Sequence, residues 1–231
     1  MTQDWRNRRR VPPSSSSLLP GLLAFLLLPC LGALPAAAFT NENGVILLHG
    51  ESGLVYTTEN VGYCGMSTVV TCTDVVGRTD DPGTVILYAL AAFPSADQPD
   101  VDGLAFGITY GEGDLVIPET GSCGDSELAT DDWPASGSGA AVVWATTQTD
   151  TVFEFYWFAA YWYYADRPTA LELGPHPTQG GVFVGSGPLS PIDDIADFGS
   201  FGFGMDGYVP CPDGPVPTRD ATWGSVKKAF R

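Results

Sequence analysis

Basic residues are scarce in this chain of 231 residues, and the motifs of common catalytic machinery are missing. Lysine and arginine number 10 against 27 acidic residues, and histidine occurs twice. The Gly-x-Ser-x-Gly, His-Glu-x-x-His and Gly-x-x-x-x-Gly-Lys motifs are absent, which argues against serine hydrolases, zinc peptidases and P-loop enzymes. So acidic a chain repels phosphate groups, which excludes nucleic acid and anionic lipid as partners.

Helical patterning is also missing until the last few residues, because no earlier segment after residue 38 keeps apolar residues at a 3.6-residue period. The apolar runs are short, rich in β-branched and aromatic residues, and separated by Gly, Pro, Asp or Ser clusters, which is typical of strands. Strands without intervening helices predict an all-β antiparallel sandwich, jelly-roll-like in layout. The predicted strands are 44–49, 54–57, 84–93, 103–110, 114–117, 140–147, 151–164, 170–173, 181–184 and 201–205.

The first 38 residues have the three parts of a cleavable signal peptide. Four arginines precede an apolar stretch, residues 18–34, which ends before Ala36-Ala37-Ala38. Prolines and glycines interrupt the stretch, so we expect cleavage after Ala38 and no membrane span afterwards. Without residues 1–38, which hold four arginines and Asp4, 6 basic and 26 acidic residues remain, a formal net charge of −20. We therefore expect a protein that is secreted, periplasmic or displayed at a bacterial cell surface.

Four cysteines follow the signal peptide, and no Cys-x-x-Cys pair or nearby histidine makes a zinc site of them. An even number of cysteines in an exported chain predicts disulfides. Three pairings are open, and we favour a short loop closed by Cys64–Cys72 together with Cys123–Cys211.

The longest aromatic run is residues 153–164, which reads FEFYWFAAYWYY. Side chains alternate between the two faces of a strand, and Glu154 marks one face as the outer one. Two interpretations of the rings on that face are open. We favour core, because aromatic side chains supply much of a core's packing area, and the other is a surface on which a ligand such as a glycan stacks. The candidate ligand-binding residues are Tyr156, Phe158, Trp162 and Tyr164.

Acidic clusters offer a second candidate site, because calcium prefers several carboxylate oxygens. Asp97, Asp100 and Asp102 loosely resemble an ion-binding loop, although the closing Glu of an EF-hand is missing. A structural calcium is one hypothesis, and a solvated acidic loop is the other. No other cofactor is expected. His176, between two prolines in a turn, is expected to be a hydrogen-bonded loop residue.

The chain is expected to end in a linker and a basic tail. Residues 39–211 form the predicted disulfide-bonded sandwich, and residues 212–222 are rich in Pro, Asp and Gly. Within residues 223–231, Trp223, Val226 and Phe230 have the spacing of a short amphipathic helix that also carries Lys227 and Lys228. Nine residues are too few for a stable isolated helix, so a helical tail would need a surface to dock on. The segment is expected to be either a frayed terminus or a docking tail that meets an acidic surface or the export machinery.

The segment Asp102-Gly-Leu-Ala-Phe-Gly-Ile-Thr-Tyr110, followed by Asp114-Leu-Val-Ile117, resembles a strand pattern of cohesin-type and carbohydrate-binding bacterial sandwich modules. The preceding strand, Val85 to Phe93, is compatible with the same layout. The resemblance implies a jelly-roll-like sandwich and favours a binding function.

Together these features predict a secreted, non-catalytic β-sandwich that binds an extracellular ligand or protein, with a glycan as one candidate. One alternative is a structural envelope or surface protein attached through its C-terminal tail. The other is a glycan-active hydrolase, which needs only two suitably placed carboxylates among the many in the chain. The oligomeric state is left open.

Overall fold

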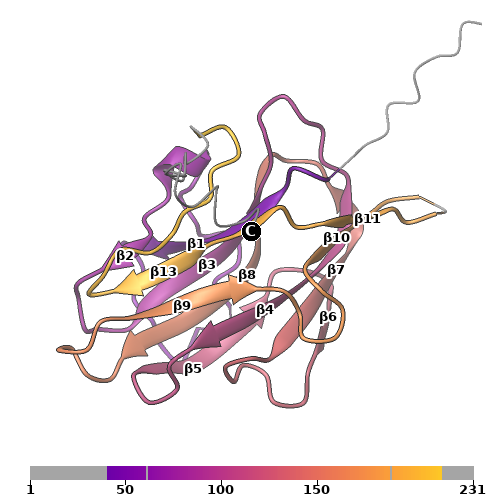
Figure 1. Cartoon of the computed structure of the whole chain (residues 1–231). Coiled ribbons are helices and arrows are strands. Elements are labelled where there is room, and N and C mark those ends of the chain that lie inside the picture. Colours follow the sequence, from indigo (N-terminus) through magenta and orange to yellow (C-terminus); the bar gives the residue numbers. More distant parts are fainter. Residues whose placement is uncertain (1–40, 61, 188, 215–231) are drawn as a thin grey trace, which may run out of the picture. The chain divides into compact units, whose positions relative to one another are not determined.

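The computed structural model describes residues 41–60, 62–187 and 189–214, which fold into two packed β-sheets (Figure 1). Within these ranges, helical structure is confined to one 3-10 turn, Cys72–Asp74. The predicted all-β sandwich is therefore confirmed. The predicted signal peptide, most of the linker and the basic tail lie outside the described residues. No helix in the described ranges is long and apolar enough to cross a membrane.

The first sheet, sheet A, has five strands in the order β12-β1-β3-β8-β5. All neighbours are antiparallel except β1 and β12. Its strands are β1 (Val45–Glu51), β3 (Val85–Ala92), β5 (Leu115–Ser122), β8 (Val152–Trp162) and β12 (Asp197–Phe198).

The second sheet, sheet B, has eight strands built around β4, which pairs with β7 along one edge and with β10 and β9 in succession along the other. Beyond these, β6 pairs with β7, β11 with β10, and β13 joins β9 to β2. Its strands are β2 (Arg78–Thr79), β4 (Val101–Tyr110), β6 (Ser126–Ala129), β7 (Gly139–Gln148), β9 (Thr169–Gly174), β10 (Val182–Gly185), β11 (Ile192–Asp194) and β13 (Ser200–Phe203).

The main core lies between the two sheets and is rich in aromatic residues from both. Two glycines of the β1 region allow the rings to approach the backbone. A Cβ on Gly44 would lie 2.3 Å from the ring of Phe93, and a Cβ on Gly50 would lie 2.6 Å from the ring of Phe201. Aromatic packing against bare backbone thus holds β1, as a strand of sheet A, closely against the core.

Most predicted strands are present, with ends shifted by a few residues. The prediction of a strand at residues 54–57 is wrong, because this segment belongs to an irregular excursion, residues 52–77, that lies over sheet A. The short strands β2, β6, β11 and β12 were not predicted. Their two to four residues are too few to show an alternating pattern.

Candidate binding surface

The aromatic strand β8 contains a β-bulge that reverses its faces halfway along. Leu90 pairs with Glu154 and Ala89 pairs with Tyr156, so Phe155 has no partner on β3. Phe155 and Tyr156 therefore both face the core between the sheets, and Trp157 joins the apolar cluster on the outer face of sheet A. One extra residue exchanges the two faces for the rest of the strand.

The bulge buries most of the predicted ligand-binding residues. Tyr156, Phe158 and Trp162 are 1%, 0% and 6% exposed, so the predicted aromatic surface is wrong for these three residues. Tyr164 lies beyond the end of β8 and is exposed, next to Tyr163 and under the guanidinium of Arg167. Most rings of the run are core, and their packing area stabilises the sandwich.

The hydroxyl of Tyr156 connects the buried strand to two other elements. It accepts a hydrogen bond from Nε1 of Trp133 at 2.8 Å and donates one to Glu127 of β6 at 2.7 Å. Burial raises the pKa of Tyr156, and the neighbouring carboxylate of Glu127 adds to the shift. This network fixes β6 against the edge of the sandwich.

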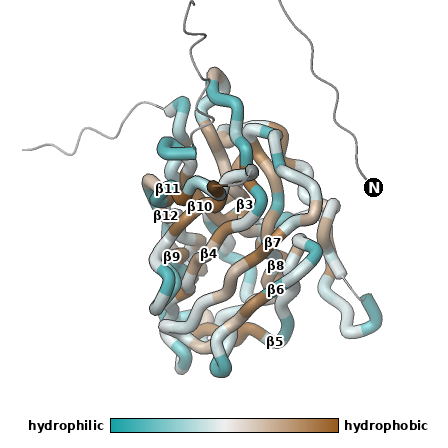
Figure 2. The backbone as a smooth tube through the Cα atoms, turned by 90° about the vertical axis from the view of Figure 1, so that its right-hand side faces the viewer, coloured by the Kyte–Doolittle hydropathy of each residue, from teal (hydrophilic) through white to brown (hydrophobic). Residues whose placement is uncertain are grey.

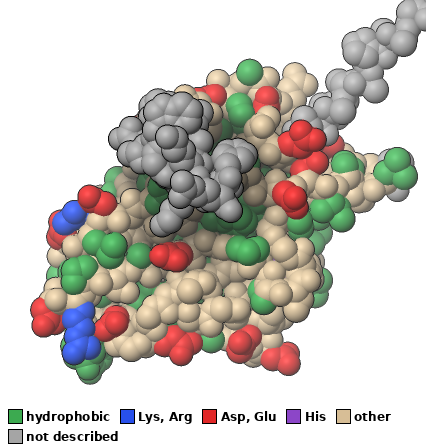
Figure 3. Space-filling model, viewed as in Figure 1, with side chains coloured by type: hydrophobic (Ala, Val, Ile, Leu, Met, Phe, Trp, Pro, Cys, Tyr) green, Lys and Arg blue, Asp and Glu red, His purple; other side chains and the backbone are tan. Residues whose placement is uncertain are grey.

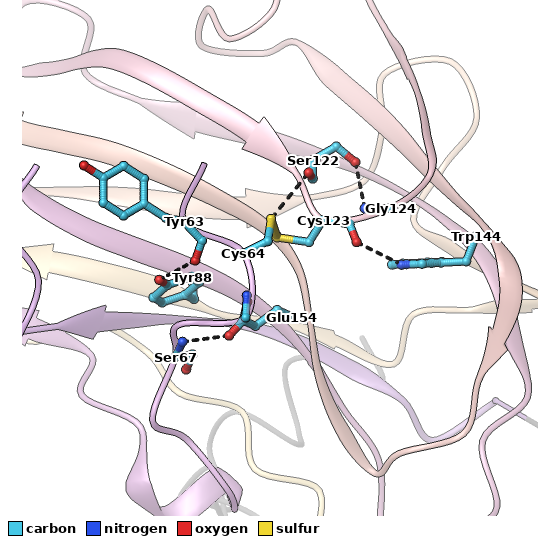
Figure 4. Close-up of a disulfide and its surroundings, with 10 residues drawn as sticks. Tyr63, Cys64, Ser67, Tyr88, Ser122, Cys123, Gly124, Trp144 and Glu154 are labelled. Atoms are coloured by element: carbon cyan, nitrogen blue, oxygen red, sulfur yellow. Dashed lines mark hydrogen bonds between the residues drawn. A yellow bond between two sulfur atoms is a disulfide. The ribbon is translucent and has the colours of Figure 1, made fainter. Parts of the chain in front are cut away.

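The outer face of sheet A is closed by the excursion 52–77. Tyr63, 1% exposed, packs edge-on against Trp157, and its carbonyl accepts a 2.7 Å hydrogen bond from the hydroxyl of Tyr88. The carboxylate of Glu154 accepts hydrogen bonds from the backbone of Gly65 and Ser67 (Figure 4). Glu154 thus faces outward, as expected, yet it holds a covering loop. This face is not open to a ligand.

Two disulfides hold that excursion, and their pairing differs from the favoured one. Cys64 is bonded to Cys123 at the end of β5, and Cys72 is bonded to Cys211. The favoured pairing, Cys64–Cys72 with Cys123–Cys211, is wrong. Both bonds join the covering loop to distant parts of the chain, and neither closes a short loop within it.

A buried polar pair also holds the excursion. Nδ1 of His49 accepts a 3.0 Å hydrogen bond from the backbone N–H of Val76, which leaves Nε2 to donate to Glu51 at 3.4 Å. Glu51 also accepts from the backbone and hydroxyl of Thr68. Burial would raise the pKa of Glu51, but the hydrogen bonds from Thr68 and its neighbours outweigh that effect and lower it.

The acidic residues predicted as calcium ligands have separate partners. The carboxylate of Asp97 is 3.5 Å from the amide of Asn43. Asp100 accepts from the hydroxyl of Ser186 at 2.9 Å, and Asp102 accepts from that of Thr147 at 2.6 Å. No three His, Cys, Asp or Glu side chains gather closely enough to hold a metal ion in the part of the chain that the structure describes.

His176 is a buried loop residue held by its neighbours, as expected. Its Nδ1 accepts hydrogen bonds from the backbone N–H groups of Thr178 and Gln179, both at 3.2 Å. Burial lowers the pKa of His176, because the charged imidazolium loses its hydration. These hydrogen bonds hold the imidazole within the turn.

The outer face of sheet B, in contrast, carries an apolar trough lined by residues of β6, β7, β4 and β10, with β11 at one end. Figure 2 shows β6, β7, β4 and β10 side by side, with hydrophobic stretches along them. Strand pairing places outward-facing residues in two parallel rows. The first row is Leu128, Ala141, Ala105 and Val182. The second row is Val143, Gly103, Val184 and Ile192.

Small residues occupy the middle of the trough, and larger side chains flank them. Ala105, 2% exposed, forms the floor, while Leu128 and Val143 rise beside it and are 67% and 42% exposed. The trough has a volume of about 340 Å³. Contiguous exposed apolar surface of this kind marks interaction sites in soluble proteins.

The charges around the trough are negative. Asp102 lines it, and Asp194 is the β11 residue paired with Val182 at the end of the first row. The basic side chains among the described residues are Arg78 and Arg167, and both are held by aspartates elsewhere. On the face shown in Figure 3, acidic side chains are spread widely and basic ones lie at one edge.

No protein-family model and no curated protein matches the chain. Among solved structures, several cohesin modules are similar to the chain. A cohesin module of a family 33 glycoside hydrolase from Clostridium perfringens has a TM-score of 0.43 at 10% identity, over 55% of this chain and 89% of that one. The sixth cohesin of scaffoldin B from Acetivibrio cellulolyticus, solved with a dockerin, has a TM-score of 0.42 at 8% identity, over 56% and 93%. The seventh ScaB type I cohesin from Pseudobacteroides cellulosolvens has 0.37 at 13%, over 62% and 92%.

The fold and the open face together define the class of protein: a disulfide-bonded β-sandwich module with one closed and one open outer face. Sequence reasoning missed the trough because the residues of its two rows come from five separate strands. The available signal was the small residues Gly103 and Ala105 alternating with Leu104 and Phe106 along one predicted strand. A small residue in every outward position lowers the middle of a sheet face.

Proposed function

We propose that this chain is an exported, non-catalytic β-sandwich module that binds a protein partner through the trough on sheet B. One observation carries the proposal: two outward rows of apolar side chains cross four strands and have a floor of Gly and Ala. Segments with large apolar side chains fit such a groove, as amphipathic helices do in many grooves.

The disulfides support the exported part of the proposal. All four cysteines after residue 38 are paired, two and two. Disulfides persist in oxidising compartments and are rare in the reducing cytosol. This agrees with the signal-peptide pattern of residues 1–38.

Two observations support the non-catalytic part. Nδ1 of each histidine is already engaged by backbone N–H groups, so neither ring resembles an open catalytic base. A glycan-active hydrolase would need an open aromatic cleft flanked by two carboxylates, and the aromatic rings of β8 are mostly core.

A second candidate function is glycan binding at the end of β8. Tyr163 and Tyr164 are 63% and 41% exposed and meet edge-on at 4.8 Å. One face of Tyr164 is covered by Arg167, so Tyr163 is the ring that a sugar would stack on.

Selection of a displayed library of helical peptides against the full chain tests the main proposal. The selected peptides are expected to lose at least about tenfold in affinity with Val143→Gln, which puts a polar group in the trough wall. The matched control is Val55→Gln, a similarly sized change at a 79% exposed valine of the loop over sheet A. Equal affinities for both variants would refute the assignment of the trough. A glycan array, read with Tyr163→Ala, tests the second candidate.

A further inference from the structure

The two lysines of this chain stand side by side in its last five residues. Lys227 and Lys228 follow a mature chain that is otherwise strongly acidic. Trp223, Val226 and Phe230 have helical spacing in the same segment. The segment 223–231 lies outside the described residues, and its sequence combines what the trough lacks, large apolar rings and positive charge.

The tether is long enough for this segment to reach the trough of its own chain. The described residues end at Gly214, and the neighbouring Asp213 accepts a 2.9 Å hydrogen bond from the backbone N–H of Ser95. Seven residues separate Ser95 from Asp102 at the trough, which is a span of at most about 25 Å. Ten residues separate Asp213 from Trp223, and they reach up to about 35 Å.

The length of the first row also agrees with the length of a nine-residue helix. The first row of the trough crosses four strands, which are three inter-strand spacings or about 14 Å. A nine-residue helix is about 13 Å long. A helix laid along that row would place two or three apolar side chains over the floor of Ala105 and Ala141, between walls formed by Leu128 and Val182.

The charges favour this occupant over a second copy of the sandwich face. Asp102 and Asp194 lie at the trough, and neither Arg78 nor Arg167 lines it. Two such faces would bring acidic residues together, whereas a segment with Lys227 and Lys228 would place opposite charges beside them. The attraction is strongest where the apolar contact has removed water.

Resting on the proposed function of the trough, we infer that the basic segment 223–231 docks in the trough of its own chain. Its apolar residues cover the floor, and its lysines lie near Asp102 and Asp194. The docked segment occupies the surface that an external partner would use, so the partner competes with it. The tail is thereby an internal competitor for the binding surface.

Zero-length carbodiimide coupling of the full chain tests this inference, because it joins carboxylates to nearby amines and Lys227 and Lys228 are the only lysines. Mass spectrometry then locates the carboxylate coupled to each lysine. Coupling within one chain to Asp102 or Asp194 is the expected result. Coupling only to other carboxylates, only between chains, or none at all would overturn it.

Two variants make the test specific. Trp223→Ala with Phe230→Ala keeps both lysines but removes the rings, and coupling to Asp102 and Asp194 should fall at least about tenfold. The matched control, Arg231→Gln, removes one charge and leaves rings and lysines in place, so most coupling should remain. Equal coupling in both variants would mean that charge alone positions the tail, which would contradict the inferred apolar docking.

The outcomes separate this inference from the proposed function. If Val143→Gln weakens the selected peptides while the lysines couple elsewhere, only the docking of the tail is wrong. If neither result appears, the trough itself is wrong as a binding surface.

Discussion

The disulfide pairing yields a sharp prediction, because pairs of cysteine substitutions distinguish the structure from the pairing favoured by sequence. Cys64→Ser with Cys123→Ser removes one complete disulfide and should add no free thiol to the wild-type count. Cys64→Ser with Cys72→Ser removes one cysteine from each disulfide and should add two. Cys30 contributes equally to every count and cancels.

The stability cost follows from the loops that the bonds close. The bonded cysteines are 59 and 139 residues apart, so the chain-entropy relation assigns about 4 kcal/mol to Cys64–Cys123 and about 5 kcal/mol to Cys72–Cys211. The matched variant should therefore lose about 4 kcal/mol of unfolding free energy and the mismatched variant about 9 kcal/mol. Urea unfolding and thiol titration under denaturing conditions measure both quantities. Two added thiols in the matched variant and none in the mismatched one would refute the pairing.

Three further predictions concern the core and pH. Phe158→Ala should cost about 3–5 kcal/mol of unfolding free energy because Phe158 is fully buried, whereas Tyr164→Ala should cost less than about 1 kcal/mol because Tyr164 is exposed. Similar costs for the two variants would contradict the bulged register. Tyr156→Phe should cost about 0.5–1.5 kcal/mol by removing its hydrogen bonds to half-buried Trp133 and exposed Glu127, which urea unfolding would show. Because burial lowers the folded-state pKa of His176, the unfolded chain binds more protons below about pH 6.5, so stability should fall as pH decreases from there. His176→Gln should flatten that part of the pH profile, and an unchanged slope would exclude this histidine as the cause.

The sequence predicted where the strands lie better than it predicted which side chains of each strand face the core. Alternation and turn residues located the long strands, and the even cysteine count predicted disulfides. The faces of β8 could not be predicted, because the bulge depends on how Ala89 and Leu90 pair with it from another strand. Glu154 was a correct marker of the outer face for its own half of the strand. Beyond Phe155 the same rule gave the wrong face.

The two outer faces could not be distinguished from sequence for a related reason. The excursion 52–77 contains ordinary turn residues and short apolar runs, and the residues that hold it over sheet A, such as Cys123, Cys211 and Glu154, lie far away in the sequence. The trough depends on pairing between strands that lie up to about eighty residues apart, such as Gly103 with Val184. The excursion leaves no local pattern, and the trough leaves one only at its floor, where Gly103 and Ala105 alternate with large residues.

Carbene footprinting of the intact, disulfide-bonded chain tests the central claim most directly, since it reports which apolar side chains meet solvent. The Trp223→Ala, Phe230→Ala variant is the sample of choice, because its tail cannot shield the trough with its rings. We predict strong labelling of Leu128 and Val143 on sheet B, and weak labelling of Leu47 and Trp157 on sheet A. Strong labelling of Leu47 and Trp157 with protection of Leu128 and Val143 would contradict the account.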